Sequence, residues 1–241
     1  MSIQGMKVLV TGGGTGIGLG LTERFLQLGN KVIICGRRLD VLEEAQKKHA
    51  QLIIKVCDLE SEEDRESLFK WIQTEHPDLN VLVNNAGIQH WANLDDADFM
   101  KKTRQEISIN IEAPLHLGHL FLKLSEPKII MNVTSGLSYV PFAKVSVYSA
   151  TKAFLHSFTA SQRKLLESKG IEVIEIVPPA LNTDLGAPGL HAAYPPVSEF
   201  IDCIFKKLED GERKKLTFGI SEIWDKAGPA EMDATFVALN G

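Results

Sequence analysis

KVLVTGGGTGIG, residues 7–18, joins an aliphatic run directly to a glycine-rich stretch. The run 7–11 is nearly continuous in valine and leucine, as a strand buried on both faces must be. Gly12, Gly16 and Gly18 permit a tight turn with close backbone approach, and a following helix would offer free amides to a phosphate. A glycine-rich loop alone also fits a merely flexible loop, so the elements on either side of it decide its meaning.

Short aliphatic runs and amphipathic stretches alternate along the chain. The runs expected to be strands are 7–11, 31–35, 52–57, 81–83, 128–134, 172–177 and 215–220. Helices are expected at 21–28 before the Gly-Asn pair 29–30, after the capping-box-like SEED at 61–64, and over 103–124, 148–168 and 198–209. This alternation requires a parallel sheet with helices on both faces.

The sequence therefore predicts an α/β protein with a single-domain, Rossmann-type doubly wound parallel sheet spanning residues 1–241. We find no internal repeat, low-complexity tract or linker in the sequence. The stretch 178–196 is rich in proline and glycine. We interpret it as a loop over a site rather than as a domain boundary, with a substrate loop at about 185–200.

The composition argues against several classes of protein. The chain has 241 residues, of which 44% are hydrophobic and 24% charged, so it can bury one sizeable core. No segment has the unbroken apolar length of a membrane span, and the first residues do not have the pattern of a secretory signal. The net charge of −5, without a block of basic residues, argues against a nucleic acid partner.

The three cysteines and the paired histidines give no metal-binding pattern. Cys35 and Cys57 each end an aliphatic run and are expected to be small buried residues, and Cys203 leaves an odd number. A reduced, cytoplasmic setting fits this usage. His116 and His119 could share a ligand, but no cysteine or acidic residue near them in the sequence completes a site. We therefore expect no metal.

VYSATKAF, residues 147–154, places a tyrosine and a lysine four positions apart, on one face of the expected helix. Taken alone, this pair fits a packing tyrosine beside an unrelated surface lysine. With the other motifs, however, the chain resembles the short-chain dehydrogenase/reductase family. The family's motifs stand in order at Thr11 to Gly18, NNAG 84–87, Asn110, Ser135, Tyr148 and Lys152.

The resemblance extends to about residue 185, and the thirteen residues from the serine to the tyrosine are typical of the family. Within the family, NVTSGL at 132–137 and the chain length are similar to the bacterial DltE-like oxidoreductases, which implies no substrate. The family implies an oxidoreductase that acts on a small-molecule carbonyl or alcohol with a nicotinamide cofactor. It also implies a homodimer or homotetramer, because helices such as 103–124 and 148–168 form subunit contacts in this family.

The catalytic residues that the resemblance implies are Asn110, Ser135, Tyr148 and Lys152. A free tyrosine hydroxyl has a pKa of about 10, so Lys152 is expected to lower the pKa of Tyr148. Tyr148 would then exchange a proton with the substrate oxygen, which Ser135, or alternatively Ser138, would hold.

Asn110 carries a local argument of its own. Pro114 has no amide hydrogen, so the carbonyl of Asn110 loses its α-helical partner and becomes free to hold a water. The family's proton relay runs through such a water to the lysine. An ordinary bend in the helix is an equal alternative.

The end of the second strand bears on the choice of cofactor. Gly36 stands where enzymes that use NAD usually have an acid, and Arg37 and Arg38 follow it. An arginine fork suits a 2′-phosphate, and NADP-dependent members of the family place a basic residue here. We therefore expect NADP(H) rather than NAD, with Arg37 ahead of Arg38. A solvated arginine pair is the alternative, and Thr15 stands where many NADP-dependent relatives have a basic residue.

Other cofactor contacts are implied by the resemblance. Asp58 would accept from the adenine amino group, with a role at the start of a helix as the alternative. Thr183 would contact the nicotinamide amide, although Pro179 replaces the family's glycine in this segment. The full predicted cofactor set is Gly12, Thr15, Gly16, Ile17, Gly18, Arg37, Arg38, Asp58, Asn85, Ala86, Gly87, Tyr148, Lys152 and Thr183.

The sequence leaves two other functions to consider, and it gives no interpretation of one segment of the chain. A non-catalytic NADP-binding regulatory protein could use the same fold, but such proteins commonly lose the tyrosine or lysine. A sugar-nucleotide epimerase usually needs a larger C-terminal domain than the residues after Asp184 provide. The candidate pocket walls are Trp91, Phe142, Val145 and Leu185, each of which packing alone would explain. The segment 221–241 has no interpretation from the sequence.

Overall fold

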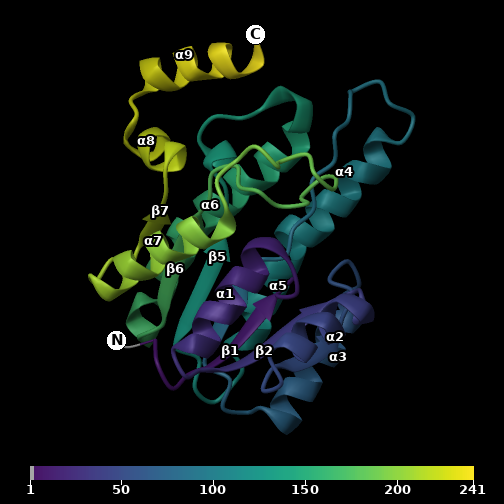
Figure 1. Ribbon diagram of the computed structural model, residues 1–241, viewed down its shortest axis with the longest axis vertical. Coiled ribbons are helices and arrows are strands. Elements are labelled where there is room, and N and C mark those ends of the chain that lie inside the picture. Colours follow the sequence, from purple (N-terminus) through teal and green to yellow (C-terminus); the bar gives the residue numbers. More distant parts are fainter. Residues whose placement is uncertain (1–2) are drawn as a thin grey trace.

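The computed structural model describes residues 3–241, and its strands form one seven-stranded parallel sheet (Figure 1). The strands are β1 (Lys7–Thr11), β2 (Lys31–Gly36), β3 (Ile53–Val56), β4 (Val81–Asn84), β5 (Ile129–Val133), β6 (Glu172–Val177) and β7 (Lys215–Thr217). Their order is β3-β2-β1-β4-β5-β6-β7, so the chain reverses its direction of travel between β1 and β4. The predicted doubly wound α/β fold is confirmed.

Helices cover both faces of the sheet (Figure 1). They are α1 (Gly16–Gln27), α2 (Leu39–Lys48), α3 (Glu62–Glu75), α4 (Phe99–Ile107), α5 (Ala113–Phe121), α6 (Ser146–Leu166), α7 (Val197–Glu209), α8 (Ile220–Lys226) and α9 (Pro229–Asn240). Buried residues of α1, α2 and α7 share one hydrophobic cluster with the sheet, and those of α3, α5 and α6 share the other. The sequence prediction omitted α2, α8 and α9.

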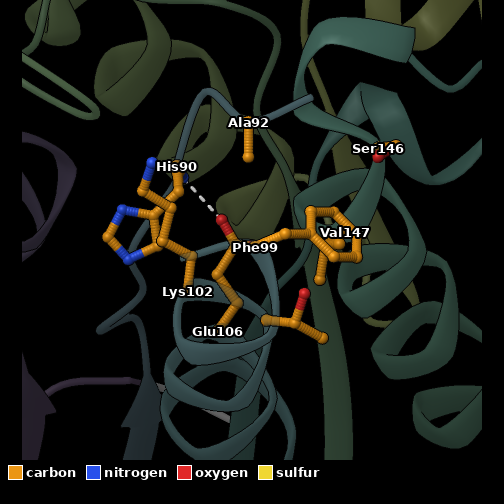
Figure 2. A pocket seen from close by; sticks show the side chains of 8 residues that line it. His90, Ala92, Phe99, Lys102, Glu106, Ser146 and Val147 are labelled. Carbon is orange, nitrogen blue, oxygen red and sulfur yellow. Dashed lines mark hydrogen bonds between the residues drawn. The ribbon is translucent and has the colours of Figure 1, made fainter. Parts of the chain in front are cut away.

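The expected helix 103–124 is divided in the structure. After α4, a π-helical segment spans Ser108–Glu112, and α5 follows with Pro114 in its first turn. The wider π-helical turn thus immediately precedes the residue that cannot donate an α-helical hydrogen bond. Figure 2 shows Phe99, Lys102 and Glu106 of α4 near the start of α6.

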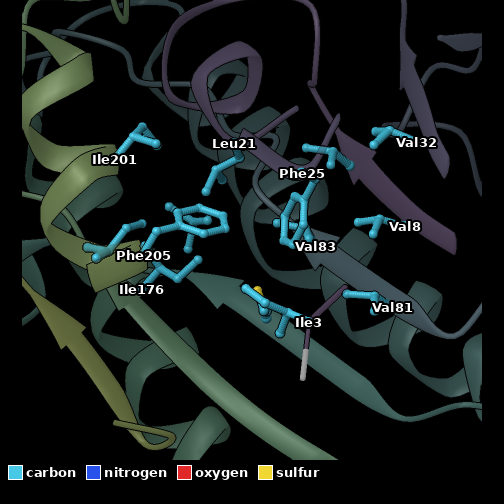
Figure 3. Packing of buried hydrophobic residues seen from close by; sticks show 14 of the residues in the cluster. Ile3, Val8, Leu21, Phe25, Val32, Val81, Val83, Ile176, Ile201 and Phe205 are labelled. Carbon is cyan, nitrogen blue, oxygen red and sulfur yellow. The ribbon is translucent and has the colours of Figure 1, made fainter. Parts of the chain in front are cut away.

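Alternate residues of each strand face opposite clusters, which is why the strands read as unbroken aliphatic runs. Val8 and Val10 of β1 belong to the cluster with α1 and α7, whereas Leu9 belongs to the cluster with α3 and α5. On the first face the rings of Phe25 and Phe205 meet edge to face at 5.3 Å (Figure 3). This packing fixes α1, and with it the glycine-rich turn, against the sheet.

Candidate active site

The predicted motifs gather at the carboxyl edge of the sheet. Thr11 ends β1, Asn84 ends β4, and Ser135 follows β5 by two residues. In parallel sheets of this kind, ligands bind beside the strands where the strand order reverses, here between β1 and β4. The fold therefore brings together motifs that are more than seventy residues apart in the sequence.

The glycine-rich turn requires glycine at particular positions. Gly12 and Gly16 have φ values of +63° and +52°, a left-handed conformation that glycine adopts without strain. A β-carbon placed on Gly18 would lie 2.1 Å from the carbonyl oxygen of Gly12. Thr15, which is exposed, and Ile17, which is partly buried, occupy the start of α1. The turn and the free amides of α1 fit the pyrophosphate of a dinucleotide cofactor.

A hydrogen-bonded cross-link joins the glycine turn to the segment after β4. The Thr11 hydroxyl accepts from the amides of Asn85 and Ala86, both at 3.0 Å. The Asn85 side-chain amide donates to the carbonyls of Thr11, at 2.9 Å, and Gly12, at 3.3 Å. The side chain of Asn85 is thus part of the scaffold that shapes the turn, while Ala86 and Gly87 line the edge beside it.

Ser135 and Tyr148 meet at the end of β5, as the sequence predicts. Tyr148 is 6% exposed, and its phenol hydrogen-bonds the side chain of Ser135. The hydroxyl of Ser138 instead donates to the backbone carbonyl of Ser135 at 2.6 Å. Of the two serines considered, Ser135 therefore faces the phenol.

Lys152 and Asn110 both lie close to Gly87. The Lys152 ammonium is 5.6 Å from the centre of the Tyr148 ring and donates to the carbonyl of Val133 at 2.8 Å. A β-carbon on Gly87 would lie 3.2 Å from Asn110 Oδ1 and 3.5 Å from Lys152 Nζ. The small NNAG segment thus leaves the space in which both polar groups approach each other.

Asn110 is fixed by its side chain. Oδ1 accepts from the amide of Ile88 at 2.9 Å, and Nδ2 donates to the carbonyl of Ile88 at 2.9 Å and to the Thr151 hydroxyl at 3.1 Å. The π-helical turn that carries Asn110 therefore locks the segment after β4 to α6.

The electrostatics of the tyrosine differ from the sequence prediction. Burial raises the pKa of Tyr148 above its ordinary value, although the hydrogen bond from Ser135 opposes this. Burial also lowers the pKa of Lys152 to about 8. In the protein chain itself the pKa of Tyr148 is thus raised and not lowered as predicted, because desolvation of the phenolate is the largest effect. The protein alone favours the neutral phenol.

Three predicted cofactor residues follow the carboxyl ends of β2 and β3. Arg37 and Arg38 directly follow β2, and both side chains are exposed. Asp58 follows β3, and its Oδ1 accepts from the Glu60 amide at 3.0 Å. The side chain that caps α3 is that of Ser61, so Asp58 forms the turn before the helix rather than its cap.

The segment after β6 passes over the glycine turn. A β-carbon on Gly16 would lie 3.4 Å from the Thr183 methyl group, which places the predicted threonine beside the start of α1. No non-glycine residue in the described chain has a positive φ and no peptide bond there is cis, so Pro179 is accommodated in place of the family's glycine.

Two of the four candidate pocket residues contact each other. The rings of Trp91 and Phe142 meet edge to face at 5.8 Å. Val145 is buried just before α6, and Leu185 is half-buried. A β-carbon on Gly186 would lie 3.5 Å from the Trp91 indole nitrogen, so the segment after Thr183 reaches this wall.

The C-terminal segment, which the sequence left uninterpreted, supports the Ser135 loop. A β-carbon on Gly136 would lie 3.2 Å from the Trp224 ring of α8. The buried hydroxyl of Ser221 donates to the carbonyl of Val177 at 2.7 Å. At the end of α9, the Asn240 side chain accepts from the Ala143 amide at 2.6 Å and donates to the Pro141 carbonyl at 3.1 Å.

The predictions for cysteine and histidine have mixed outcomes. Cys35 and Cys57 are buried, as expected. His116, however, does have acidic neighbours: its ring and the carboxylates of Glu62 and Glu66, which precede it by about fifty positions, lie within 4.8 Å of one another. Both glutamates are exposed, and Arg65 donates to His116 Nδ1 at 3.1 Å, so we assign no metal there.

Comparison with known proteins agrees with this geometry. The sequence profile of the family described as short chain dehydrogenase matches residues 6–191. The uncharacterized oxidoreductase DltE of Bacillus subtilis is 39% identical over 254 residues, which cover 100% of this chain and 98% of the relative. The NADP-dependent 3-hydroxy acid dehydrogenase YdfG of Escherichia coli O6:H1 is 31% identical over 180 residues, 72% of this chain and 71% of the relative.

The fold has a close match among solved structures. A short chain dehydrogenase from Burkholderia cenocepacia in complex with NADP superposes with a TM-score of 0.85 at 24% identity, over 99% of each chain. Within residues 3–241, no helix combines the length and apolar character needed to cross a bilayer. Since the matched family profile spans every motif of the site, the chain belongs to the short-chain dehydrogenase family of oxidoreductases.

Proposed function

We propose that the protein is an NADP(H)-dependent oxidoreductase that transfers hydride between the nicotinamide and a carbonyl or alcohol substrate. The observation that carries this proposal is the contact of the buried Tyr148 phenol with Ser135, with the Lys152 ammonium 5.6 Å from the phenol ring. When bound, the cofactor supplies or accepts the hydride. The chain's own residues then have to hold the substrate oxygen and move one proton.

Each member of the catalytic set has a distinct task in this proposal. Tyr148 donates a proton to the substrate oxygen in reduction and takes it back in oxidation, and Ser135 hydrogen-bonds that oxygen as charge develops on it. Lys152 hydrogen-bonds the ribose of the cofactor, and its positive charge stabilises the phenolate that remains after proton donation. Asn110 holds the segment after β4 against α6.

The neutral phenol in the protein supports carbonyl reduction, because in that direction Tyr148 already carries the proton that it has to donate. Because burial keeps the pKa of Tyr148 above its ordinary value, the proton is present when a carbonyl substrate arrives. In the opposite direction the phenolate must form first. The positive charge of an oxidised nicotinamide would assist that step.

The substrate would enter between Trp91 and Phe142 and the loop at about 185–200, within a single domain that spans the chain. A test of the function is to follow NADPH absorbance with a panel of ketones, aldehydes and quinones. We expect turnover with at least one class of small apolar carbonyl compound. Binding of NADPH without turnover of any carbonyl or alcohol would instead indicate a nucleotide-binding regulator.

The cofactor proposal predicts a selective effect at Arg37. Its exposed guanidinium, which makes no ion pair or hydrogen bond within the described chain, can form a charge-assisted pair with a 2′-phosphate. Arg37→Ala is expected to weaken NADPH binding by about tenfold and to leave NADH binding unchanged. Fluorescence titration of both cofactors measures this, with Arg38→Ala expected to show a smaller effect. Tighter binding of NADH than of NADPH to the wild type would contradict the proposal.

The support of the Ser135 loop by α8 gives a second prediction. Trp224→Ala removes the ring that packs on Gly136, so the loop loses a wall and the free energy of unfolding should fall by about 1–2 kcal/mol. We expect kcat/KM to fall by about tenfold, because Ser135 is no longer held in place. Thermal unfolding and steady-state kinetics measure both effects. Ile223→Ala, at an exposed position of the same helix, is the control and should change neither.

A further inference from the structure

Glu106 is a buried carboxylic acid that the proposed catalytic set does not use. It is 1% exposed and lies on α4, four residues before Asn110, so the two side chains project on the same side of the helix. Figure 2 shows its carboxyl group between the backbone of His90 and the ring of Phe99. Burying a carboxyl group is costly unless it is hydrogen-bonded. Its place beside the active site therefore points to a role there.

One carboxyl oxygen holds a wall of the site. Glu106 Oε1 accepts from the amide of His90 at 2.5 Å, two residues after the amide of Ile88 that Asn110 binds. Glu106 and Asn110 thus both hold the segment that begins directly after Gly87. Since Gly87 faces Lys152, movement of this segment would change the space beside the lysine.

The other carboxyl oxygen is free of hydrogen bonds to the described residues. Glu106 Oε2 is buried, and so are two further polar atoms without such partners, Thr103 Oγ1 and His90 Nε2. Glu106 lines a small, partly open pocket. The other residues lining this pocket are His90, Ala92, Phe99, Lys102, Thr103, Ser146 and Val147. Two of them, Ser146 and Val147, begin the helix that carries Tyr148.

Titratable groups lie on the segment before α4, on α4 itself and on α6, the three stretches of chain that border Glu106 or its pocket. They are His90 and Asp98 before α4, Lys102 within α4, and Tyr148 and Lys152 on α6. Lys102 is paired with Asp98 at 3.0 Å. Burial, followed by the charge of Lys102, lowers the pKa of His90, which favours its neutral form. The charge that acts on Tyr148 from this side is therefore that of Glu106 itself.

We propose that Glu106 is a positioning residue that fixes the segment 88–90 and, through its negative charge, keeps Tyr148 in the proton-donating form. This inference rests on the proposed function. It gives the site a bias towards carbonyl reduction at neutral and alkaline pH.

The direction of the effect follows from two pKa changes. Burial raises the pKa of Glu106 to about 7, so the carboxyl is neutral below that pH and negative above it. The negative charge in turn raises the pKa of Tyr148. As the pH rises through 7, Glu106 ionises and the phenol becomes harder to deprotonate, so reduction continues to higher pH than it would without this charge.

Glu106→Gln separates the two parts of the role, because its amide oxygen can still accept from His90 but cannot ionise. We expect the alkaline limb of kcat against pH for carbonyl reduction to move down by about 0.5–1 pH unit, with KM for NADPH within about twofold of the wild type. Glu106→Ala also removes the acceptor and should raise that KM. Glu112→Gln, at an exposed glutamate of the adjoining π-helical segment, is the matched control and should leave the profile in place. If the alkaline limb of kcat against pH does not move in Glu106→Gln, the proposed role of Glu106 is wrong. The proposed function would still stand.

A second measurement does not depend on turnover. Infrared difference spectra between pH 5 and pH 9 should show the band of a protonated carboxylic acid that disappears near pH 7 and is missing in Glu106→Gln. Such a band in the wild type supports the proposal even if the variant does not fold. Titration of Glu106 at an ordinary glutamate pKa of about 4.3 overturns it. If no carbonyl or alcohol is turned over, the proposed function fails by the activity panel, and the spectrum still decides whether Glu106 titrates as described.

Discussion

Tyr148→Phe is expected to lower kcat for carbonyl reduction by about 10²- to 10⁴-fold, the usual contribution of a general acid. The phenylalanine ring preserves the packing of a residue that is 6% exposed, but it carries no proton to donate and cannot hydrogen-bond Ser135. NADPH binding should change by less than about threefold, because the other predicted cofactor residues stay in place. Single-turnover kinetics and fluorescence titration measure the two quantities separately.

A matched control for this substitution is Tyr139→Phe. Tyr139 belongs to the loop after Ser135, but its ring packs edge to face on His156 at 5.1 Å, away from the proposed proton transfer. Loss of its hydroxyl should leave kcat within about twofold of the wild type. If Tyr148→Phe kept more than about a tenth of wild-type turnover, the proton donor would have to be another group.

Gly18→Ala is expected to abolish measurable binding of NADPH and to destabilise the protein. The new β-carbon would lie 2.1 Å from the Gly12 carbonyl oxygen and 2.5 Å from Asn85 Nδ2, so backbone must move rather than a flexible side chain. Overpacking of this kind costs about 1–3 kcal/mol, or roughly 2–12 °C in melting temperature for a chain of this size. Displacing the turn would also redirect the amides of α1 that fit the pyrophosphate.

Calorimetric titration with NADPH and thermal unfolding test this prediction together. Gly228→Ala is the control, because a β-carbon there meets nothing within 4 Å and the φ of −79° suits alanine. It should leave cofactor affinity unchanged and lower the melting temperature by less than Gly18→Ala does, because its only expected cost is a weaker N-cap of α9. Wild-type NADPH affinity in Gly18→Ala would show that the cofactor does not use this turn.

The fold could be predicted from the sequence because its signals are local. Aliphatic runs at regular spacing identify the strands, and the glycine turn between β1 and α1 identifies the first crossover. The contact between Ser135 and Tyr148 was also predictable, since the resemblance to the family's motifs implies it. The helix α2 was omitted, although Leu42 and Ala45 form its buried face, because its remaining residues are mostly polar.

Other features depend on packing that the sequence does not display. Glu106 shares the helical spacing of Asn110, which is a weak signal, but its burial depends on the segment 88–90 folding over it. The neighbours of His116 come from a helix about fifty positions earlier. The pKa of Tyr148 was predicted in the wrong direction because charge can be read from residue types, whereas loss of solvent requires the three-dimensional structure.

The ties between Asn240 and the residues at 141 and 143 bear on how the protein is best prepared for kinetic work. Because Asn240 bonds to the backbone that leads into the tyrosine-bearing helix, a bulky group introduced next to residue 240 would lie beside that backbone. Strand β1, by contrast, begins at the amino edge of the sheet, opposite the motifs. A bulky purification handle is therefore better placed near β1 than next to residue 240, where displacing Asn240 would lower the measured turnover number.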